Sequence, residues 1–115
     1  MKIAKIVRLI AIAALAAGTA EAATQNILGF DDMSCAAWNK AKSDSDQRAG
    51  YIVWVRGFLS GHNYALPNQQ VSTISSGTIE VNLNNYCSAT PAGSISDGAM
   101  RLSDQFSGRN QPIRK

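Results

Sequence analysis

The chain has 115 residues and a formal net charge of +3, from 11 Lys/Arg against 8 Asp/Glu, with a single histidine. Without its first 22 residues the balance is nearly neutral, because eight Lys/Arg then face seven Asp/Glu. Outside the last seven residues no basic cluster remains, so we expect no nucleic-acid binding. The length is that of one small domain.

The N-terminus has the pattern of a secretory signal peptide. Three basic residues precede an unbroken apolar run at residues 9–17, and the Ala-Glu-Ala at residues 20–22 has the spacing of a signal-peptidase site. The run is less than half of the roughly 20 residues that a membrane-spanning helix needs. We therefore expect cleavage after Ala22, a periplasmic location and no membrane span.

Two cysteines, Cys35 and Cys87, follow the expected cleavage site. In an oxidising compartment we expect them to form one disulfide. The alternative, a catalytic or metal-binding thiol, needs a thiolate beside a basic partner, and an even cysteine count with one histidine argues against it.

Capping residues and apolar spacing predict four helices. Ser34 caps the first, a cluster of Ser and Asp at residues 43–46 separates it from the second, and Gly108 ends the last. The expected helices span residues 35–42, 46–63, 78–88 and from Ser94 or Ser96 to 107. We expect an all-α domain at residues 34–107, preceded by an arm at 23–33 and followed by a flexible tail at 108–115. In the first helix Cys35, Trp38 and Ala36 are expected to face inward.

The second helix has a competing interpretation as a strand, because Ile-Val-Trp-Val at residues 52–55 favours β-structure locally. Strict alternation would place Tyr51, Val53 and Val55 on one face. Helical spacing instead gathers a broad apolar face over two to three turns, and we expect the helix. That face comprises Tyr51, Val55, Phe58 and His62, flanked by Ile52 and Leu59. Residues 78–81 can likewise be interpreted as a strand or as part of a helix.

Gly57 and Gly61 fall one turn apart on the second helix. Each costs roughly 0.5 to 1 kcal/mol relative to alanine, and close approach of another backbone would compensate for this cost. We therefore interpret the pair as a helix-contact strip, filled either by the chain's own helices or by a second subunit. Chance placement, or Gly61 as an early helix terminator, are the alternatives.

No catalytic constellation is present in the sequence. His62 stands alone near a helix end, and the carboxylate pairs Asp31/Asp32 and Asp44/Asp46 lie in polar segments where capping or solvation explains them. We expect no catalytic residue, no metal and no cofactor. The candidate packing or interface residues are aromatic: Trp38, Tyr51, Trp54, Phe58 and Tyr86.

Four segments carry a family resemblance: CAAW at residues 35–38, WVRGFLSGHN at 54–63, NNYCSATP at 84–91 and DGAMRL at 97–102. Together they resemble a group of small exported bacterial proteins, which is similar to the HdeA/HdeB periplasmic acid-stress chaperones and to the Rap1a/Tai immunity proteins. The resemblance covers about residues 35–106. It implies a disulfide-tied four-helix fold of the HdeA type.

The resemblance also implies two functions. The first is a non-catalytic protein-binding module that acts as an acid or stress chaperone on unfolded periplasmic clients, with a homodimer as one form. The alternative is an immunity or inhibitor protein that neutralises one exported toxin or cell-wall hydrolase.

Overall fold

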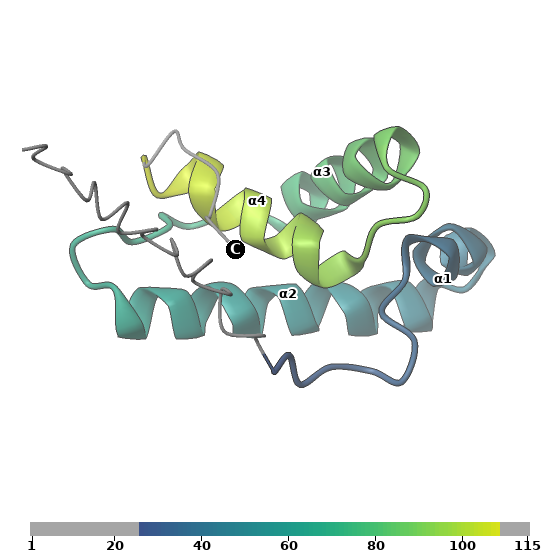
Figure 1. Cartoon of the computed structure of the whole chain (residues 1–115), viewed down its shortest axis with the longest axis horizontal. Coiled ribbons are helices and arrows are strands. Elements are labelled where there is room, and N and C mark those ends of the chain that lie inside the picture. Colours follow the sequence, from purple (N-terminus) through teal and green to yellow (C-terminus); the bar gives the residue numbers. More distant parts are fainter. Residues whose placement is uncertain (1–25, 109–115) are drawn as a thin grey trace, which may run out of the picture.

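The computed structural model describes residues 26–108. Within this range the chain forms α1 (Cys35–Lys40), the 3₁₀ helix η1 (Ala41–Ser43), α2 (Ser45–Ala65), α3 (Ser76–Ala89) and α4 (Ile95–Phe106), and no strand. The predicted all-α class with four helices is confirmed (Figure 1). The predicted signal peptide, the first residues of the arm and nearly all of the tail lie outside the described residues.

Each α-helix begins at a polar side chain that accepts a hydrogen bond from the backbone N–H three residues later, which satisfies one of the donors that the first turn leaves free. These capping residues are Ser34, Asp44, Ser75 and Ser94. The predicted boundaries hold to within two residues, except that the first helix tightens into η1 after Lys40.

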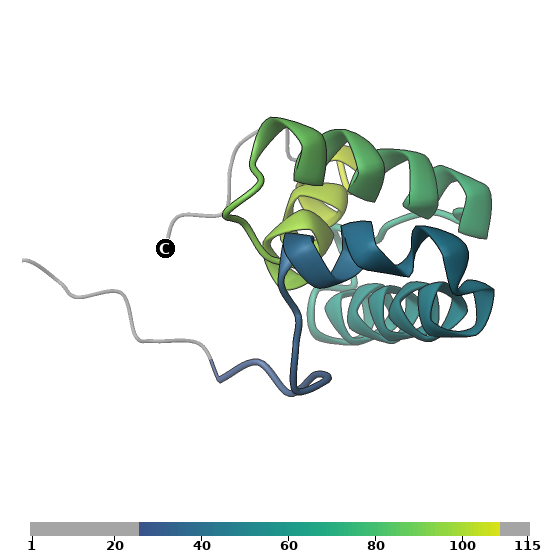
Figure 2. The ribbon, with the colours of Figure 1, turned by 90° about the vertical axis from the view of Figure 1, so that its right-hand side faces the viewer.

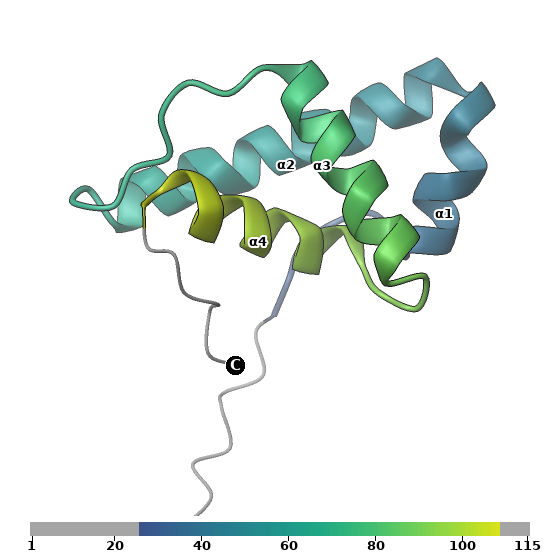
Figure 3. The same ribbon diagram turned by 90° about the horizontal axis from the view of Figure 1, so that it is seen from above.

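The longest helix, α2, lies along one side of the domain, and α3 and α4 lie across it (Figures 1 and 3). Helix α1 closes one end of this arrangement (Figure 2). A short antiparallel bridge between Ser34 and Ser94 joins the starts of α1 and α4. Its backbone hydrogen bonds, from Cys35 N to Gly93 O and from Ile95 N to Met33 O, measure 2.9 and 2.7 Å.

One hydrophobic core receives side chains from all four α-helices. On α2 the strand alternative is wrong, because it would bury Val53 beside Tyr51 and Val55, yet Val53 is 66% exposed. On α1 the buried alanine is Ala37, not Ala36. The largest fully buried side chains are Trp38, Tyr51, Val55, Ile79, Leu83, Ile95 and Leu102.

The segment between α2 and α3 is fastened to the end of α2 by side chains of that helix. The Asn63 amide donates to Val71 O at 3.0 Å and accepts from Val71 N at 2.7 Å. The His62 Nε2 atom lies 2.8 Å from Gln69 O. His62 therefore lies in the last turn of α2, where it holds a loop.

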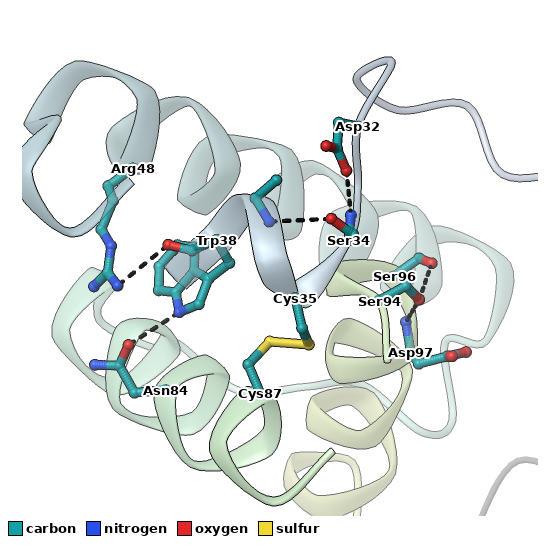
Figure 4. Close-up of a disulfide and its surroundings, with 11 residues drawn as sticks. Asp32, Ser34, Cys35, Trp38, Arg48, Asn84, Cys87, Ser94, Ser96 and Asp97 are labelled. Atoms are coloured by element: carbon teal, nitrogen blue, oxygen red, sulfur yellow. Dashed lines mark hydrogen bonds between the residues drawn. A yellow bond between two sulfur atoms is a disulfide. The ribbon is translucent and has the colours of Figure 1, made fainter. Parts of the chain in front are cut away.

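The predicted disulfide joins Cys35 at the first residue of α1 to Cys87 in the last turn of α3 (Figure 4). Both residues are completely buried, and their Cα atoms lie 5.1 Å apart. The bridge spans a sequence separation of 52 residues. It therefore ties the short helix α1 to a helix from the other half of the domain.

We expect Cys35→Ser, Cys87→Ser or the double substitution to lower the free energy of unfolding by up to about 4 kcal/mol, because a long loop is no longer closed in the unfolded chain. Urea denaturation followed by circular dichroism measures the change, and the same experiment on wild type in reductant is the control. Equal stability of wild type and the double variant would contradict the structural role of the bridge.

The glycine contact strip is not filled by the chain's own helices. Among residues 26–108, a Cβ atom built on Gly57 or Gly61 meets nothing within 4 Å, so no described helix packs on either position. The close approach between helices lies instead at Gly98 of α4, where a Cβ would come within 2.8 Å of Leu83 Cδ2 and 3.1 Å of Tyr86 Cδ1. A glycine is needed where α4 crosses α3, and not on α2.

This geometry predicts opposite effects for two alanine substitutions. Gly57→Ala should stabilise the protein by about 0.5 to 1 kcal/mol, since alanine is the better helix former and has room. Gly98→Ala should destabilise it by about 1 to 3 kcal/mol, because the methyl group overpacks the α3–α4 contact. Thermal unfolding of the two variants in parallel tests both signs, and a destabilising Gly57→Ala would show that another surface covers the strip.

Candidate functional site

The predicted aromatic residues divide into a buried group and an outer group. Trp38 and Tyr51 belong to the core, and Tyr86 packs half-buried beneath α4 with the Arg101 guanidinium 5.3 Å from its ring centroid. Trp54 and Phe58 are also half-buried, but their rings stack on each other at the surface of α2, with centroids 5.7 Å apart. This second pair lies beside an open groove, which makes it the better candidate for a partner.

The arm that precedes α1 runs alongside α2 (Figure 1), and its Leu28 contacts Trp54 of the stacked pair. The Trp54 indole Nε1 donates to Leu28 O at 2.7 Å, and the Tyr51 hydroxyl donates to Asp32 O at 2.8 Å. The Phe30 ring meets the Tyr51 ring edge-on, with centroids 5.1 Å apart. In both hydrogen bonds a side chain of α2 donates to a main-chain carbonyl of the arm, so α2 holds the arm mainly through the backbone of the arm.

Two apolar side chains of the arm remain largely in solvent, whereas Ile27 and Met33 are half-buried. Leu28 is 81% exposed and Phe30 is 50% exposed. Between the arm and α2 lies an open groove of about 500 Å³, lined by Asn26, Ile27, Leu28, Trp54, Gly57 and Phe58. No residue of this lining carries a charge. The groove is therefore an apolar surface that the arm borders without filling.

The side of α2 opposite the core continues this apolar surface. We call its apolar and glycine residues, together with the half-buried Trp54 and Phe58 at its border with the core, the outer face of α2: Val53, Trp54, Gly57, Phe58, Gly61 and Tyr64. The exposed polar residues Arg56 and Ser60 lie among them. Val53, Gly57 and Tyr64 are spaced by four and seven residues, which aligns them along one stripe of a helix. Tyr64 is 92% exposed. Arg56 is the only Lys, Arg, Asp or Glu between residues 51 and 65.

A second groove, of about 410 Å³, lies between α2 and the segment that follows it, and its lining is more polar. Two of its polar side chains have partners: Arg56 donates to Ile74 O at 3.0 Å, and Asn63 is paired with Val71. These contacts anchor the loop, so of the two grooves the one beside Trp54 is the better candidate binding site.

Sequence reasoning missed a buried arginine at the junction of three helices. The Arg48 guanidinium of α2 lies 4.0 Å from the Trp38 ring centroid and donates to Glu80 Oε1 of α3 at 2.8 Å. The Trp38 indole in turn donates to Asn84 Oδ1 at 2.9 Å (Figure 4). Arg48 lies three residues before Tyr51, so helical spacing placed it near the core face, but only tertiary structure supplies its partners.

Within residues 26–108, no group of three or more His, Cys, Asp or Glu side chains is placed to hold a metal ion. In the same range, no helix combines the length and the apolar character needed to cross a bilayer. Comparison with protein-family models, with curated proteins and with solved structures finds no match to this chain.

One carboxylate at the base of the arm has a shifted pKa. Hydrogen bonds from the Ser34 hydroxyl and from Ser34 N, the latter at 3.0 Å, lower the pKa of Asp32 below its ordinary 3.8, and Lys40 adds a smaller effect. Because the pKa is lower in the folded chain, the ionised carboxylate stabilises the fold above the ordinary pKa. This contribution is lost as the pH falls through the lowered value.

We therefore expect Asp32→Asn to reduce stability at neutral pH and to have a diminishing effect below the ordinary pKa of 3.8. Urea denaturation of wild type and variant across the acid range measures the difference in the free energy of unfolding. Asp31→Asn removes one charge at the neighbouring position and controls for net charge. An Asp32→Asn effect that is constant with pH would contradict the assignment.

Proposed function

We propose that this protein is a small periplasmic, non-catalytic protein-binding module of the HdeA-like kind, with acid or stress chaperoning as its specific role. The observation that supports this proposal is the apolar surface formed by the outer face of α2 and the arm. A surface helix ordinarily turns charged and polar residues to solvent, whereas α2 turns Val53 and Tyr64 outward beside Arg56 and Ser60, and Gly57 and Gly61 are exposed as well. Contiguous apolar surfaces of this kind typically mark interaction sites.

The fully buried disulfide supports the expected compartment, because disulfides persist in oxidising environments such as the bacterial periplasm. It also supports a chaperone that partly unfolds in acid, because the disulfide keeps α1 and α3 covalently linked even when the packing between the other helices is lost.

One carboxylate supports a response to acid. Protonation of Asp32 weakens its interaction with Ser34, where the arm meets α1. Because the pKa of Asp32 is lowered in the folded chain, acid weakens the attachment of the arm.

The alternative is an immunity or inhibitor protein that blocks one exported toxin or hydrolase. The aromatic character of the outer face favours this alternative as well, because Tyr, Trp and Phe are enriched at the centres of specific protein interfaces. The two functions differ in the number of partners and in the pH at which binding occurs.

The proposal predicts that the purified protein suppresses aggregation of several unrelated proteins at about pH 2 to 3, where carboxylates are protonated. Light scattering of each client, with and without the protein, measures the effect. An inert protein of similar size, added at the same mass concentration, is the control. Failure to protect any client across this range overturns the chaperone role. Stoichiometric binding of a single partner at neutral pH, with no protection in acid, would establish the inhibitor instead.

A further inference from the structure

The more polar groove, between α2 and the segment at residues 66–75, contains a cation without a counter-ion. Arg56 lines this groove and is exposed. The sequence has no Asp or Glu between Asp46 and Glu80, and Glu80 is paired with Arg48. Among residues 26–108, no ion pair involves the Arg56 guanidinium. The groove is therefore complementary to a negative charge.

One hydrogen bond positions the Arg56 side chain at this groove. Its Nη1 atom donates to Ile74 O at 3.0 Å, in the segment that joins α2 to α3 (Figure 3). The guanidinium makes no other hydrogen bond within the described residues, and four of its five N–H donors remain. The Nε–H and Nη2–H groups form a planar fork that matches the two oxygens of a carboxylate.

The lining of the groove combines hydrogen-bond donors with apolar side chains. Ser72 and Thr73 contribute hydroxyl groups, which have no hydrogen-bond partner in the part of the chain that the structure describes. Leu59, Val71 and Ile74 contribute the apolar part of the lining. A ligand that matches both parts carries one negative charge directly beside an apolar group.

We propose that this groove binds the C-terminal residue of another polypeptide, with the terminal carboxylate on Arg56 and an apolar terminal side chain against the apolar lining. An internal Asp or Glu offers the charge without an adjacent apolar side chain, whereas a C-terminal Leu, Ile or Val carries both on one residue. The volume of about 410 Å³ lies within the range of ligand-binding pockets. The choice of a polypeptide over a free acid rests on the proposed protein-binding function.

This site is separate from the groove beside Trp54. The two grooves share no lining residue, because α2 turns Trp54, Gly57 and Phe58 towards one and Arg56 and Leu59 towards the other. Binding of a C-terminal residue at Arg56 therefore requires no movement of the arm. A partner can contact both grooves at once, one through apolar surface and the other through its chain end.

The test uses the full chain at neutral pH and a fluorescein-labelled peptide, GSGSGL, with a free C-terminal carboxylate. Two further peptides separate the two parts of the ligand. The same peptide with a C-terminal amide lacks the charge, and GSGSGS lacks the apolar side chain. Hexanoate, a free apolar carboxylate, is the unlabelled competitor. Fluorescence anisotropy gives the Kd of each peptide and the inhibition constant of hexanoate.

Two pairs of variants locate the site. Arg56→Gln removes the charge, and Lys42→Gln, which makes the same change of net charge at an exposed position outside the groove, is its control. Ser60→Phe narrows the groove, and Ser88→Phe, at an exposed position of α3, is its control. Circular dichroism confirms the fold of each variant.

We expect Arg56→Gln, and amidation of the peptide, each to weaken binding about ten-fold or more, the effect of losing a charge-assisted hydrogen bond. Ser60→Phe and the peptide GSGSGS should each weaken binding about three- to ten-fold, through lost apolar contact. Lys42→Gln and Ser88→Phe should match wild type. Equal affinities for the acid and the amide, or for Arg56→Gln and Lys42→Gln, overturn the proposal.

Two comparisons separate this proposal from its alternatives. Hexanoate that binds as tightly as GSGSGL would assign the site to free acids and overturn the polypeptide as its source. Peptide binding with the expected variant pattern, but without protection of clients in acid, would leave this site standing while the chaperone role fails. Protection of clients by a protein that does not bind GSGSGL would retain the proposed function and overturn the carboxylate site.

Discussion

The fold depends on the way Trp38 joins three helices. From the six-residue α1, its indole N–H bonds α3 through Asn84, and the guanidinium of Arg48 from α2 lies over its ring. The Trp38 carbonyl also accepts from Arg48, at 3.4 Å. A helix of this length is not stable in isolation, so α1 exists because these contacts and the neighbouring disulfide hold it. The charge of Arg48 is balanced by Glu80, which makes the junction dependent on one carboxylate.

The helices of this fold could be predicted from sequence because each has a polar cap and most have an apolar stripe of the right period. The spacing of Ile95, Ala99, Leu102 and Phe106 on α4 predicts one inward face; the first three are buried, and Phe106 is half-buried and packs against the core. The burial of Arg48 and the helix contact at Gly98 could not be predicted, because both depend on which helices cross. Gly57 and Gly98 are equally plausible contact glycines in the sequence, and only the crossing of α3 and α4 distinguishes them.

The candidate site was predicted only in part, for a related reason. Trp54 and Phe58 are predicted as packing or interface residues, but the same prediction covers these half-buried rings and the buried Trp38 and Tyr51. What separates the two groups is their burial in the tertiary structure, which the periodicity of α2 does not encode. The arm returns along α2 because Tyr51 and Trp54 supply donors for its carbonyls. The site thus arises where a segment without regular structure meets a helix whose outward side carries one charged residue, Arg56, between residues 51 and 65.

The two tryptophans of the chain lie in these two different environments. The Trp38 ring is sealed among α1, α2 and α3, whereas the Trp54 ring is hydrogen-bonded to the arm and lies at the surface. Intrinsic fluorescence therefore carries two separable signals, one from each indole. Acrylamide reaches the outer indole first, and a shift of the emission maximum of the inner one requires water to enter the core. The protein consequently contains two intrinsic fluorescence probes: Trp54 reports detachment of the arm, and Trp38 reports unfolding of the domain.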